Sequence, residues 1–406
     1  MTGERELDVV LLGATGFVGR LTAAHLARSA PAGLRVALAG RSAERLSALR
    51  DDLGEAASSW ALRTIDVTDD DALDRLAAST RVLATTVGPY LRSGLPVVRA
   101  CAAHGTHYAD LTGEPLFVRE TVATAHAPAQ ASGARIVHAC GFDSVPSDLG
   151  VRLLADHVAA GGDGTLGATT LHVLAMRGGF SGGTIDSGRQ QQIATAGRPD
   201  LRRVVADPEA LTGQAPSGRA RRGHPVVARE AGSDVWSGPF VMGGFNRQVV
   251  LRSDALRGWA YGPGFDYREV VDTGPGPLGA VGAAALAGGT AALLGGLSFG
   301  PTRALLDRVL PAPGEGPSDK TRAQGRFALE IRTTATSGAR WTARVAAPYD
   351  PGYDGTAVLL GESALALAGD DLPDAAGVLT PTTGIGPGLA DRLRAHRFEV
   401  DVSRTG

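Results

Sequence analysis

Short, mostly apolar runs alternate with helix-forming stretches through the first 150 residues of the chain. Apolar runs that stop at small or polar residues are typical of the buried strands of a parallel sheet. The runs are Asp8–Leu12, Leu34–Ala39, Ala61–Val67, Arg81–Val87, His107–Leu111 and Arg135–Ala139. Six strands that alternate with helices predict an α/β fold, with a doubly wound parallel Rossmann sheet over residues 1–150.

A glycine-rich turn connects the first strand to the first helix. Its sequence is GATGFVG, and the helix-forming stretch Arg20–Ala30 follows directly. In a dinucleotide site such glycines allow a tight turn and a close approach of the backbone to the pyrophosphate, and the helix N-terminus offers free N–H groups. The candidate cofactor-binding residues of this turn are Gly13, Thr15, Gly16, Phe17 and Gly19.

The end of the second strand indicates which dinucleotide binds. A site for NAD usually has an acid here to hold the ribose hydroxyls, but this chain has Arg41 and Ser42, and no acid before Glu44. An arginine fork suits a 2′-phosphate, so we predict NADP as the cofactor. Asp66, at the end of the third strand, is expected beside the adenine. Further cofactor contacts are expected at the exit of the fourth strand, from Val87, Gly88 and Pro89.

The regular alternation ends after Gly150. Thr169–Met176 alternates apolar and polar residues, and Phe327–Thr334 and Trp341–Ala347 flank a Ser-Gly turn. These patterns are typical of half-buried strands and of a hairpin. We therefore predict a second, smaller α+β domain with an antiparallel sheet over residues 151–354, for substrate binding or oligomerisation.

One segment of the second domain, residues 273–302, contains no charged residue. It is long enough to span a bilayer, but glycine and alanine dominate it, and small residues gain little from lipid while they favour close helix packing. We expect residues 277–300 to form one or two short helices, mostly buried against the protein or a partner subunit. One exposed apolar face could then meet a membrane or guide an acyl chain.

The composition excludes several classes of protein. Acidic and basic residues nearly balance, at 42 and 40, so we expect no nucleic-acid partner. Only two cysteines are present, which suits a reducing cytoplasm and gives no disulfide framework. Lys320 is the one lysine and lies in a Pro/Gly-rich stretch, which argues against Schiff-base chemistry. The histidines show no metal-ligand spacing, so we expect no metal.

Catalytic candidates must lie at the strand ends that face the nicotinamide, and we select Tyr90, Glu114 and Asp143. Tyr90 could donate a proton or only stack as an aromatic lid. Glu114 follows a glycine at a strand tip and could equally be a helix-start acid. Asp143 precedes Ser144 and a proline, as an N-cap region does, although a capping residue can still face substrate. His138 lies in an apolar strand, where a core role is the simpler interpretation.

Several motifs together resemble the saccharopine-dehydrogenase-like oxidoreductases, and more narrowly their trans-acting enoyl reductase branch. The motifs are GATGFVGR, AGRS, VGPY, GTHYADLTGE, GFDSVPSDLG, SGGTIDS, PGEGP, DPGY and GESALALAGDDLP, and they span nearly the whole chain. The chain departs from the family pattern at His107, where the family has an acid. The resemblance implies that residues 355–406 return to the Rossmann domain, and that the enzymes of this branch are partners of polyketide synthases in lipid assembly.

Three functions follow as hypotheses. The first is an NADPH-dependent enoyl (C=C) reductase of a lipid or polyketide acyl substrate, either a small molecule or carrier-bound. The second is a saccharopine-type dehydrogenase acting on a C–N bond, whose substrate would need convergent arginines; Arg177 and Arg189 form no such motif. The third is a non-catalytic NADP-binding protein at a membrane surface. The apolar segment favours the first. We expect a cytoplasmic protein, peripheral at the inner face of the plasma membrane, with a homodimer compatible with the sequence.

Overall fold

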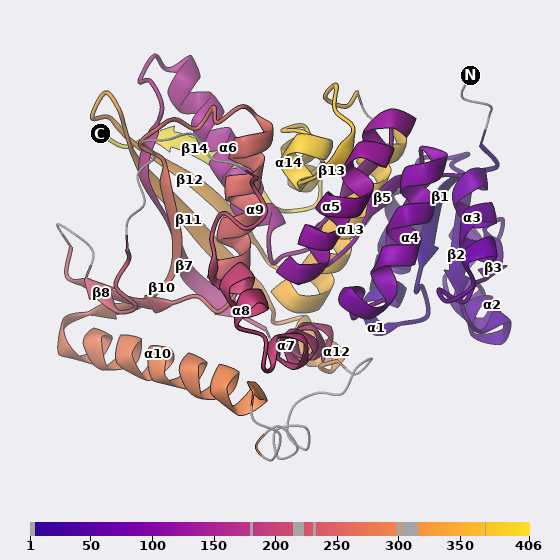
Figure 1. The fold of residues 1–406 in the computed structure, drawn as a ribbon, viewed down its shortest axis with the longest axis horizontal. Helices are drawn as coiled ribbons and strands as arrows, with labels where there is room; N and C mark the ends of the chain where they lie inside the picture. Colours follow the sequence, from indigo (N-terminus) through magenta and orange to yellow (C-terminus); the bar gives the residue numbers. More distant parts are fainter. Residues whose placement is uncertain are drawn as a thin grey trace.

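Two seven-stranded sheets organise the chain (Figure 1). The structure is a computed structural model that describes residues 5–178, 182–213, 223–229, 233–298, 302, 316–369 and 371–406. The first residue of the SGGTIDS motif and most of the PGEGP motif lie outside these ranges. The predicted α/β class is confirmed, and the second sheet is mixed rather than wholly antiparallel as predicted.

The first sheet is parallel throughout and has the strand order β13-β6-β5-β4-β1-β2-β3. Val9 in the central strand faces Val36 on one side and Val82 on the other, and all three are buried. The strands are β1 (Leu7–Leu12), β2 (Val36–Gly40), β3 (Ala61–Thr64), β4 (Thr80–Thr85), β5 (His107–Ala109), β6 (Arg135–Val137) and β13 (Gly377–Leu379). Six of them were predicted from the alternating pattern, and β13 was not.

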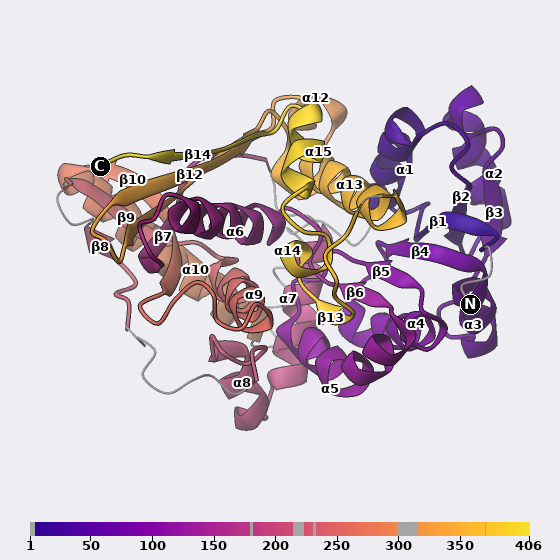
Figure 2. The ribbon, with the colours of Figure 1, turned by 90° about the horizontal axis from the view of Figure 1, so that it is seen from above.

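Helices cover both faces of this sheet (Figure 2). They are α1 (Phe17–Ser29), α2 (Ala43–Asp52), α3 (Asp70–Ser79), α4 (Tyr90–His104) and α5 (Pro115–Ser132). The next helix, α6 (Val145–Ala160), packs on the second sheet instead. Local capping sets where two of them begin: Ser42 Oγ accepts the Arg45 N–H at 3.2 Å, and Asp69 Oδ1 accepts the Ala72 N–H at 2.9 Å. Such caps satisfy N–H groups that have no partner within the helix.

The second sheet has the order β14-β12-β11-β7-β10-β9-β8, and β7 and β10 are its parallel pair. Helix α6 and helix α9 (Gly243–Leu256) pack on it. The strands are β7 (Leu166–Arg177), β8 (Ala228–Arg229), β9 (Val235–Pro239), β10 (Asp266–Pro275), β11 (Arg326–Ala335), β12 (Arg340–Ala347) and β14 (Glu399–Arg404). The predicted hairpin is present as β11 and β12, in which Phe327 faces Ala347.

The C-terminal segment is shared between the two sheets. After a π-helical turn, η2 (Pro351–Gly355), helix α13 (Thr356–Gly369) packs against α1, β4 and β5, and β13 extends the parallel sheet beside β6. Helices α14 (Pro381–Gly384) and α15 (Leu389–Ala395) follow, and β14 then pairs with β12 in the other sheet. The return that the resemblance implies thus describes α13 and β13, whereas the last strand belongs to the second sheet.

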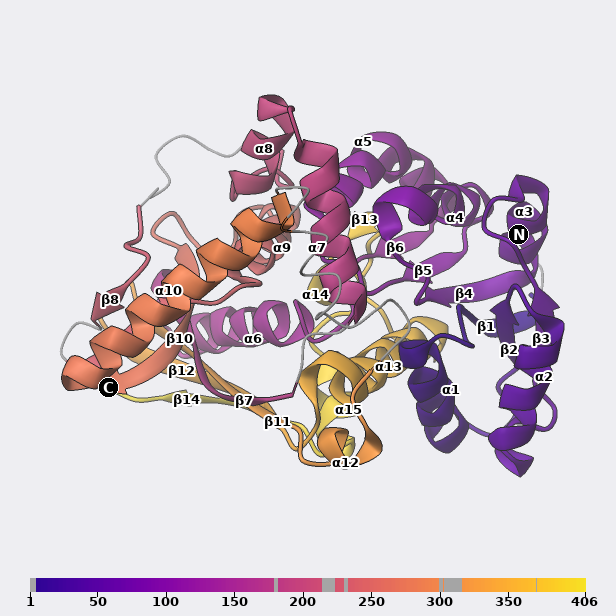
Figure 3. The same cartoon turned by 90° about the horizontal axis from the view of Figure 1, so that it is seen from below.

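The charge-free segment forms one long helix, α10 (Gly276–Ser298), rather than one or two short ones (Figure 3). Our expectation that it is mostly buried against the protein is wrong, and burial against a partner subunit stays a prediction. Only 11% of its first 18 residues are buried, and they are long and apolar enough to cross a membrane. It contacts β9 and β10 through a narrow line of small residues. A Cβ on Gly279 would lie 2.0 Å from the Gly274 carbonyl oxygen, so the small residues serve one close contact and leave the other faces exposed.

Candidate functional site

The glycine turn between β1 and α1 is shaped to receive a pyrophosphate. Gly13 has φ +85°, a left-handed conformation that favours glycine. A Cβ on Gly19 would lie 2.1 Å from the Gly13 carbonyl oxygen, so the helix lies directly on the turn. Gly16 is the N-cap of α1, and no side chain caps the helix. The first N–H groups of α1 are therefore available to an anion.

The exit of β4 lies against the same turn. Thr86 Oγ1 donates to the Gly13 carbonyl oxygen at 3.0 Å, and a Cβ on Gly13 would meet Val87 at 2.8 Å. The structure therefore brings Val87 beside the glycine turn. Gly88 and Pro89 follow Val87 directly in the chain, and the cofactor contacts of all three residues stay predictions. The ring of Phe17 instead packs on Tyr353, with ring centroids 4.9 Å apart, so that only the backbone of Phe17 remains for a phosphate.

The predicted adenosine residues gather at the ends of β2 and β3. Arg41 is exposed directly after β2, and Ser42 caps α2 with its hydroxyl. Asp66 Oδ1 accepts hydrogen bonds from the N–H and the hydroxyl of Thr68. These two bonds, and the charge of Arg41 to a smaller degree, lower the pKa of Asp66. Arg41 is therefore near Asp66 and keeps an exposed guanidinium for a 2′-phosphate.

Two of the three catalytic candidates are engaged in holding the fold. Glu114 is buried, and its carboxylate accepts the N–H groups of Tyr90 at 2.9 Å and Leu91 at 2.7 Å, at the start of α4. Ser187 from α7 (Gly182–Thr195) donates to the same carboxylate at 2.6 Å. The Tyr90 hydroxyl donates to the Thr85 carbonyl and accepts the Leu111 N–H, both at 3.1 Å. Catalytic roles for Tyr90 and Glu114 stay predictions.

His138 is buried and held by hydrogen bonds on both ring nitrogens. Its Nδ1 lies 2.7 Å from Asp110 Oδ2 and its Nε2 lies 2.8 Å from Thr121 Oγ1. Asp110 further accepts the N–H groups of Thr112 and Ala139. All of these side chains are buried, so the network fixes the tips of β5 and β6. Both ring nitrogens of His138 are engaged in it, which favours the core role over proton transfer to a substrate.

Asp143, the third candidate, has the freest carboxylate at the strand ends. It lies just before α6 and keeps part of its surface exposed. Within the described part of the chain no donor reaches it. A Cβ on Gly113 would meet Met242 at 3.3 Å and the Asp143 carboxylate at 3.8 Å. Asp143 therefore lies where the tip of β5 approaches the start of α9, a helix that packs on the second sheet. Burial raises its pKa to about 6. A carboxyl group in this state can deliver a proton near neutral pH.

A second carboxyl group, Glu269 on β10, lies next to this position, and the sequence analysis missed it. Its oxygens accept the Tyr267 hydroxyl at 2.7 Å and the Asn246 amide at 2.8 Å. The Ser144 hydroxyl in turn donates to the Asn246 amide oxygen at 3.0 Å. Burial, the largest cause, raises the pKa of Glu269 to about 7. The signal in the sequence is an acid two residues after a tyrosine in DYREVV, which places Glu269 on the same strand face as the buried Tyr267.

The comparisons with known proteins agree with this geometry. Residues 9–137 match the family model of the saccharopine dehydrogenase NADP binding domain, which confirms the predicted cofactor. The chain is 44% identical to a trans-acting enoyl reductase of Mycobacterium ulcerans and 43% identical to that of Mycobacterium bovis, in each case over 99% of both chains. It is also 46% identical, over 98% of both chains, to a Mycobacterium tuberculosis protein whose name gives trans-acting enoyl reductase as a provisional assignment.

Among solved structures, the chain resembles apo saccharopine dehydrogenase (L-Glu forming) from Saccharomyces cerevisiae. The TM-score is 0.53 at 16% sequence identity, and the match covers 100% of both chains. At this identity the likeness concerns the fold alone. It supports the arrangement of a parallel nucleotide-binding sheet followed by a second mixed sheet.

Proposed function

This chain belongs to the trans-acting enoyl reductase family of NADP-dependent oxidoreductases, and on that premise we propose that it reduces an activated C=C bond of a lipid or polyketide acyl substrate. The observation that carries the proposal is the Asp143 carboxyl group at the edge of the nucleotide-binding sheet. No donor from the described residues reaches it, and burial raises its pKa to about 6. Reduction of a double bond needs a hydride and a proton. NADPH supplies the hydride when bound, so the protein must position the acyl group and hold the proton.

In this proposal Asp143 is the proton donor, and Glu269 is a positioning residue. Glu269 holds the Asn246 amide, and Asn246 accepts the hydroxyl of Ser144, the residue next to Asp143. This chain of bonds ties the start of α6 to β10 and fixes where the Asp143 carboxyl group points. The main-chain contacts of Glu114 keep the neighbouring β4 exit in place.

The alternative of a saccharopine-type substrate has less support. Such a substrate carries several carboxylates and calls for arginines that converge on the site. Arg189 lies 3.5 Å from Asp186, and Arg177 donates to Gln324. Both arginines that the sequence offered for this role therefore already have partners within the protein. Asp143 and Glu269 would add negative charge, which disfavours a polycarboxylate.

The test is turnover of NADPH by the purified protein. We expect oxidation of NADPH with an α,β-unsaturated acyl thioester, and formation of the saturated thioester by mass spectrometry. A carrier-protein thioester should be a better substrate than the same acyl group on a small thiol, since relatives are named trans-acting. Turnover of an imine or amino-acid conjugate, with none of the enoyl thioesters, would contradict the proposal.

We further propose that α10 meets a lipid surface from the cytoplasmic side, with a polyketide synthase as the acyl donor. Leu278 and Val281 are 86% and 66% exposed, and α10 also contacts α7. Ser187 of α7 donates to Glu114, so α7 lies between the exposed apolar face of α10 and the strand ends. An acyl chain held at α10 would therefore lie one helix away from the strand ends. A homodimer through α10 is the competing arrangement.

Replacing Leu278 and Val281 together with serine should weaken binding to phospholipid vesicles. Both side chains are exposed, and losing their insertion removes about 2 kcal/mol, or ~30-fold in affinity. Vesicle co-sedimentation measures this loss. The matched control is Val226→Ser, since Val226 is 65% exposed but lies outside α10. Equal vesicle binding by all three proteins, with a dimer that dissociates in the double variant, would favour a subunit interface instead.

A further inference from the structure

A group of two histidines and one glutamate, of which His25 and Glu362 are buried and His396 is half-buried, lies outside the glycine turn. His25 comes from α1, Glu362 from α13, and His396 follows α15. His25 Nε2 and His396 Nε2 lie 2.7 and 3.0 Å from the same oxygen, Glu362 Oε1. All three ligand atoms lie within 4.8 Å of one another, and among the residues the structure describes this is the one such group.

The surrounding structure holds these three side chains in place. His25 and Glu362 are 3% and 1% exposed. The ring of His25 lies directly on the backbone of α13, because a Cβ on Gly361 would be 2.5 Å from it. Arg392 Nε donates to the other oxygen of Glu362 at 2.9 Å. An outer hydrogen bond of this kind orients a carboxylate ligand in many metal sites.

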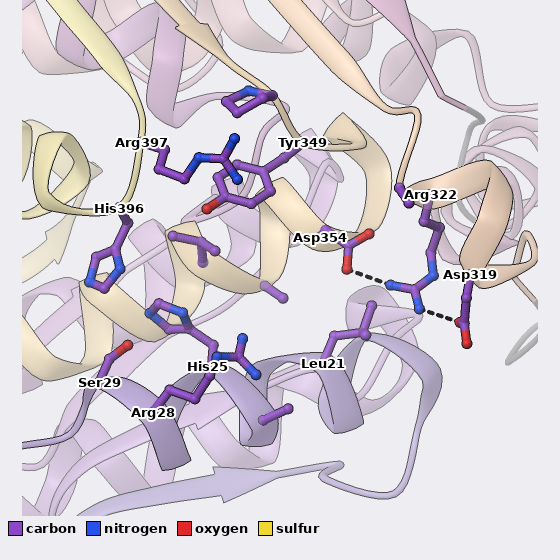
Figure 4. Close-up of a pocket in the computed structure, with 15 residues that line it drawn as sticks. Leu21, His25, Arg28, Ser29, Asp319, Arg322, Tyr349, Asp354, His396 and Arg397 are labelled. Atoms are coloured by element: carbon purple, nitrogen blue, oxygen red, sulfur yellow. Dashed lines mark hydrogen bonds and ion pairs between the residues drawn. The ribbon is translucent and has the colours of Figure 1, made fainter.

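The two histidines form one end of a pocket of about 730 Å³ (Figure 4). The pocket lies between α1, the η2–α13 region and the turn after α15, and Arg28 and Arg397 also line it. At its other end Arg322 bridges Asp319 and Asp354. The side chain of His396 is 29% exposed, so an ion can reach the group from the pocket past His396.

We propose that His25, Glu362 and His396 bind a divalent transition-metal ion of the zinc class, with the remaining coordination position directed into the pocket. Two imidazoles and one carboxylate, with an open position, are a common ligand set for Zn²⁺. Ligand atoms on a tetrahedral zinc ion are about 3.3 Å apart. The two distances from the histidine nitrogens to Glu362 Oε1, 2.7 and 3.0 Å, would therefore open by about 0.6 and ~0.3 Å when the ion binds. Spacing along the chain gave no sign of the site, because its ligands come from three distant segments.

The charges around the site indicate what completes the coordination. Arg392 already balances the charge of Glu362, and Arg28 and Arg397 add positive charge at the pocket. The ion therefore needs an anion, such as hydroxide or chloride, as its fourth ligand. The bound ion would join α1 of the nucleotide-binding sheet to α13 and to the turn that leads into β14, and would stabilise the folded chain by mass action.

The experiment uses the full chain without a histidine tag, treated with EDTA and then dialysed. Titration with Zn²⁺ should give one ion per chain by calorimetry and elemental analysis. Co²⁺ should produce the visible absorption of a four-coordinate site, and Zn²⁺ should raise the melting temperature. His396→Gln should lose more than the roughly 10- to 100-fold in affinity that outer-sphere changes cost. Since His396 is partly exposed, this variant should still fold.

The matched control is His104→Gln, which removes a half-buried histidine at the end of α4 and should leave Zn²⁺ binding unchanged. Glu362→Gln tests the third ligand, and its circular dichroism spectrum reports whether it folds. Absence of Zn²⁺ uptake by the native chain would overturn the proposal. So would equal affinity in the native chain and in folded His396→Gln. None of these measurements depends on the reductase activity, so the two proposals fail separately.

Discussion

Replacing Asp143 with asparagine should lower kcat for enoyl reduction by about 100- to 10,000-fold, which is the usual contribution of a positioned proton donor. Asparagine keeps the size of the side chain but carries no acidic proton. The affinity for NADPH should be nearly unchanged, because the glycine turn and Arg41 lie at other strand ends. Steady-state kinetics with a carrier-bound enoyl thioester gives kcat, and quenching of NADPH fluorescence gives the binding constant.

The pH profile provides a second measurement on the same residue. A proton donor works in its protonated form, which dominates below its pKa. Because burial raises the pKa of Asp143 to about 6, kcat should fall as the pH rises through about 6. The asparagine variant should lose this dependence. Asp71→Asn, on the exposed face of α3, is the control and should keep both the rate and the profile. A native profile in the Asp143 variant would assign the proton to another group.

Glu269→Gln should act differently if Glu269 only positions its neighbours. The amide can still accept from the Tyr267 hydroxyl, but it no longer offers two equivalent acceptors to Tyr267 and Asn246. A modest loss of kcat with an unchanged pH profile would fit that role, whereas loss of the profile would make Glu269 the proton donor.

The nucleotide-binding half could be predicted because its signals are local. A buried strand, a glycine turn and a helix follow one another within the first 30 residues. Gly13 and Gly19 each have a steric reason in the structure: a Cβ on Gly19, for example, would lie 2.1 Å from the Gly13 carbonyl oxygen. The choice of NADP rested on Arg41, which stands directly after the strand that meets the ribose. Structure that depends on residues close together in the sequence can be predicted from the sequence pattern.

The remainder depends on contacts between distant segments. Glu269 comes near Asp143 only because β10 pairs with β7 in the second sheet and α9 bridges them. Glu114 follows a glycine at a strand tip, a position that favours exposure. In the structure it is buried, because its carboxylate accepts two N–H groups at the start of α4. Composition alone did not predict how α10 packs. Its small residues predicted close packing all round, but only one narrow face of the helix packs closely against the protein.

Replacing Arg41 with alanine should weaken NADPH binding about tenfold to a hundredfold and leave NADH binding nearly unchanged. The loss of one charge-assisted contact to the 2′-phosphate costs about 1.5–3 kcal/mol, and NADH has no such phosphate. Arg41→Lys should give an intermediate loss, since the charge remains but the fork that matches a phosphate does not. Arg75→Ala, an exposed arginine of α3, controls for the change in net charge. Binding is measured by fluorescence titration at fixed ionic strength, because part of the contact is screened by salt. An equal loss for both cofactors would mean that Arg41 supports the loop after β2 rather than the phosphate.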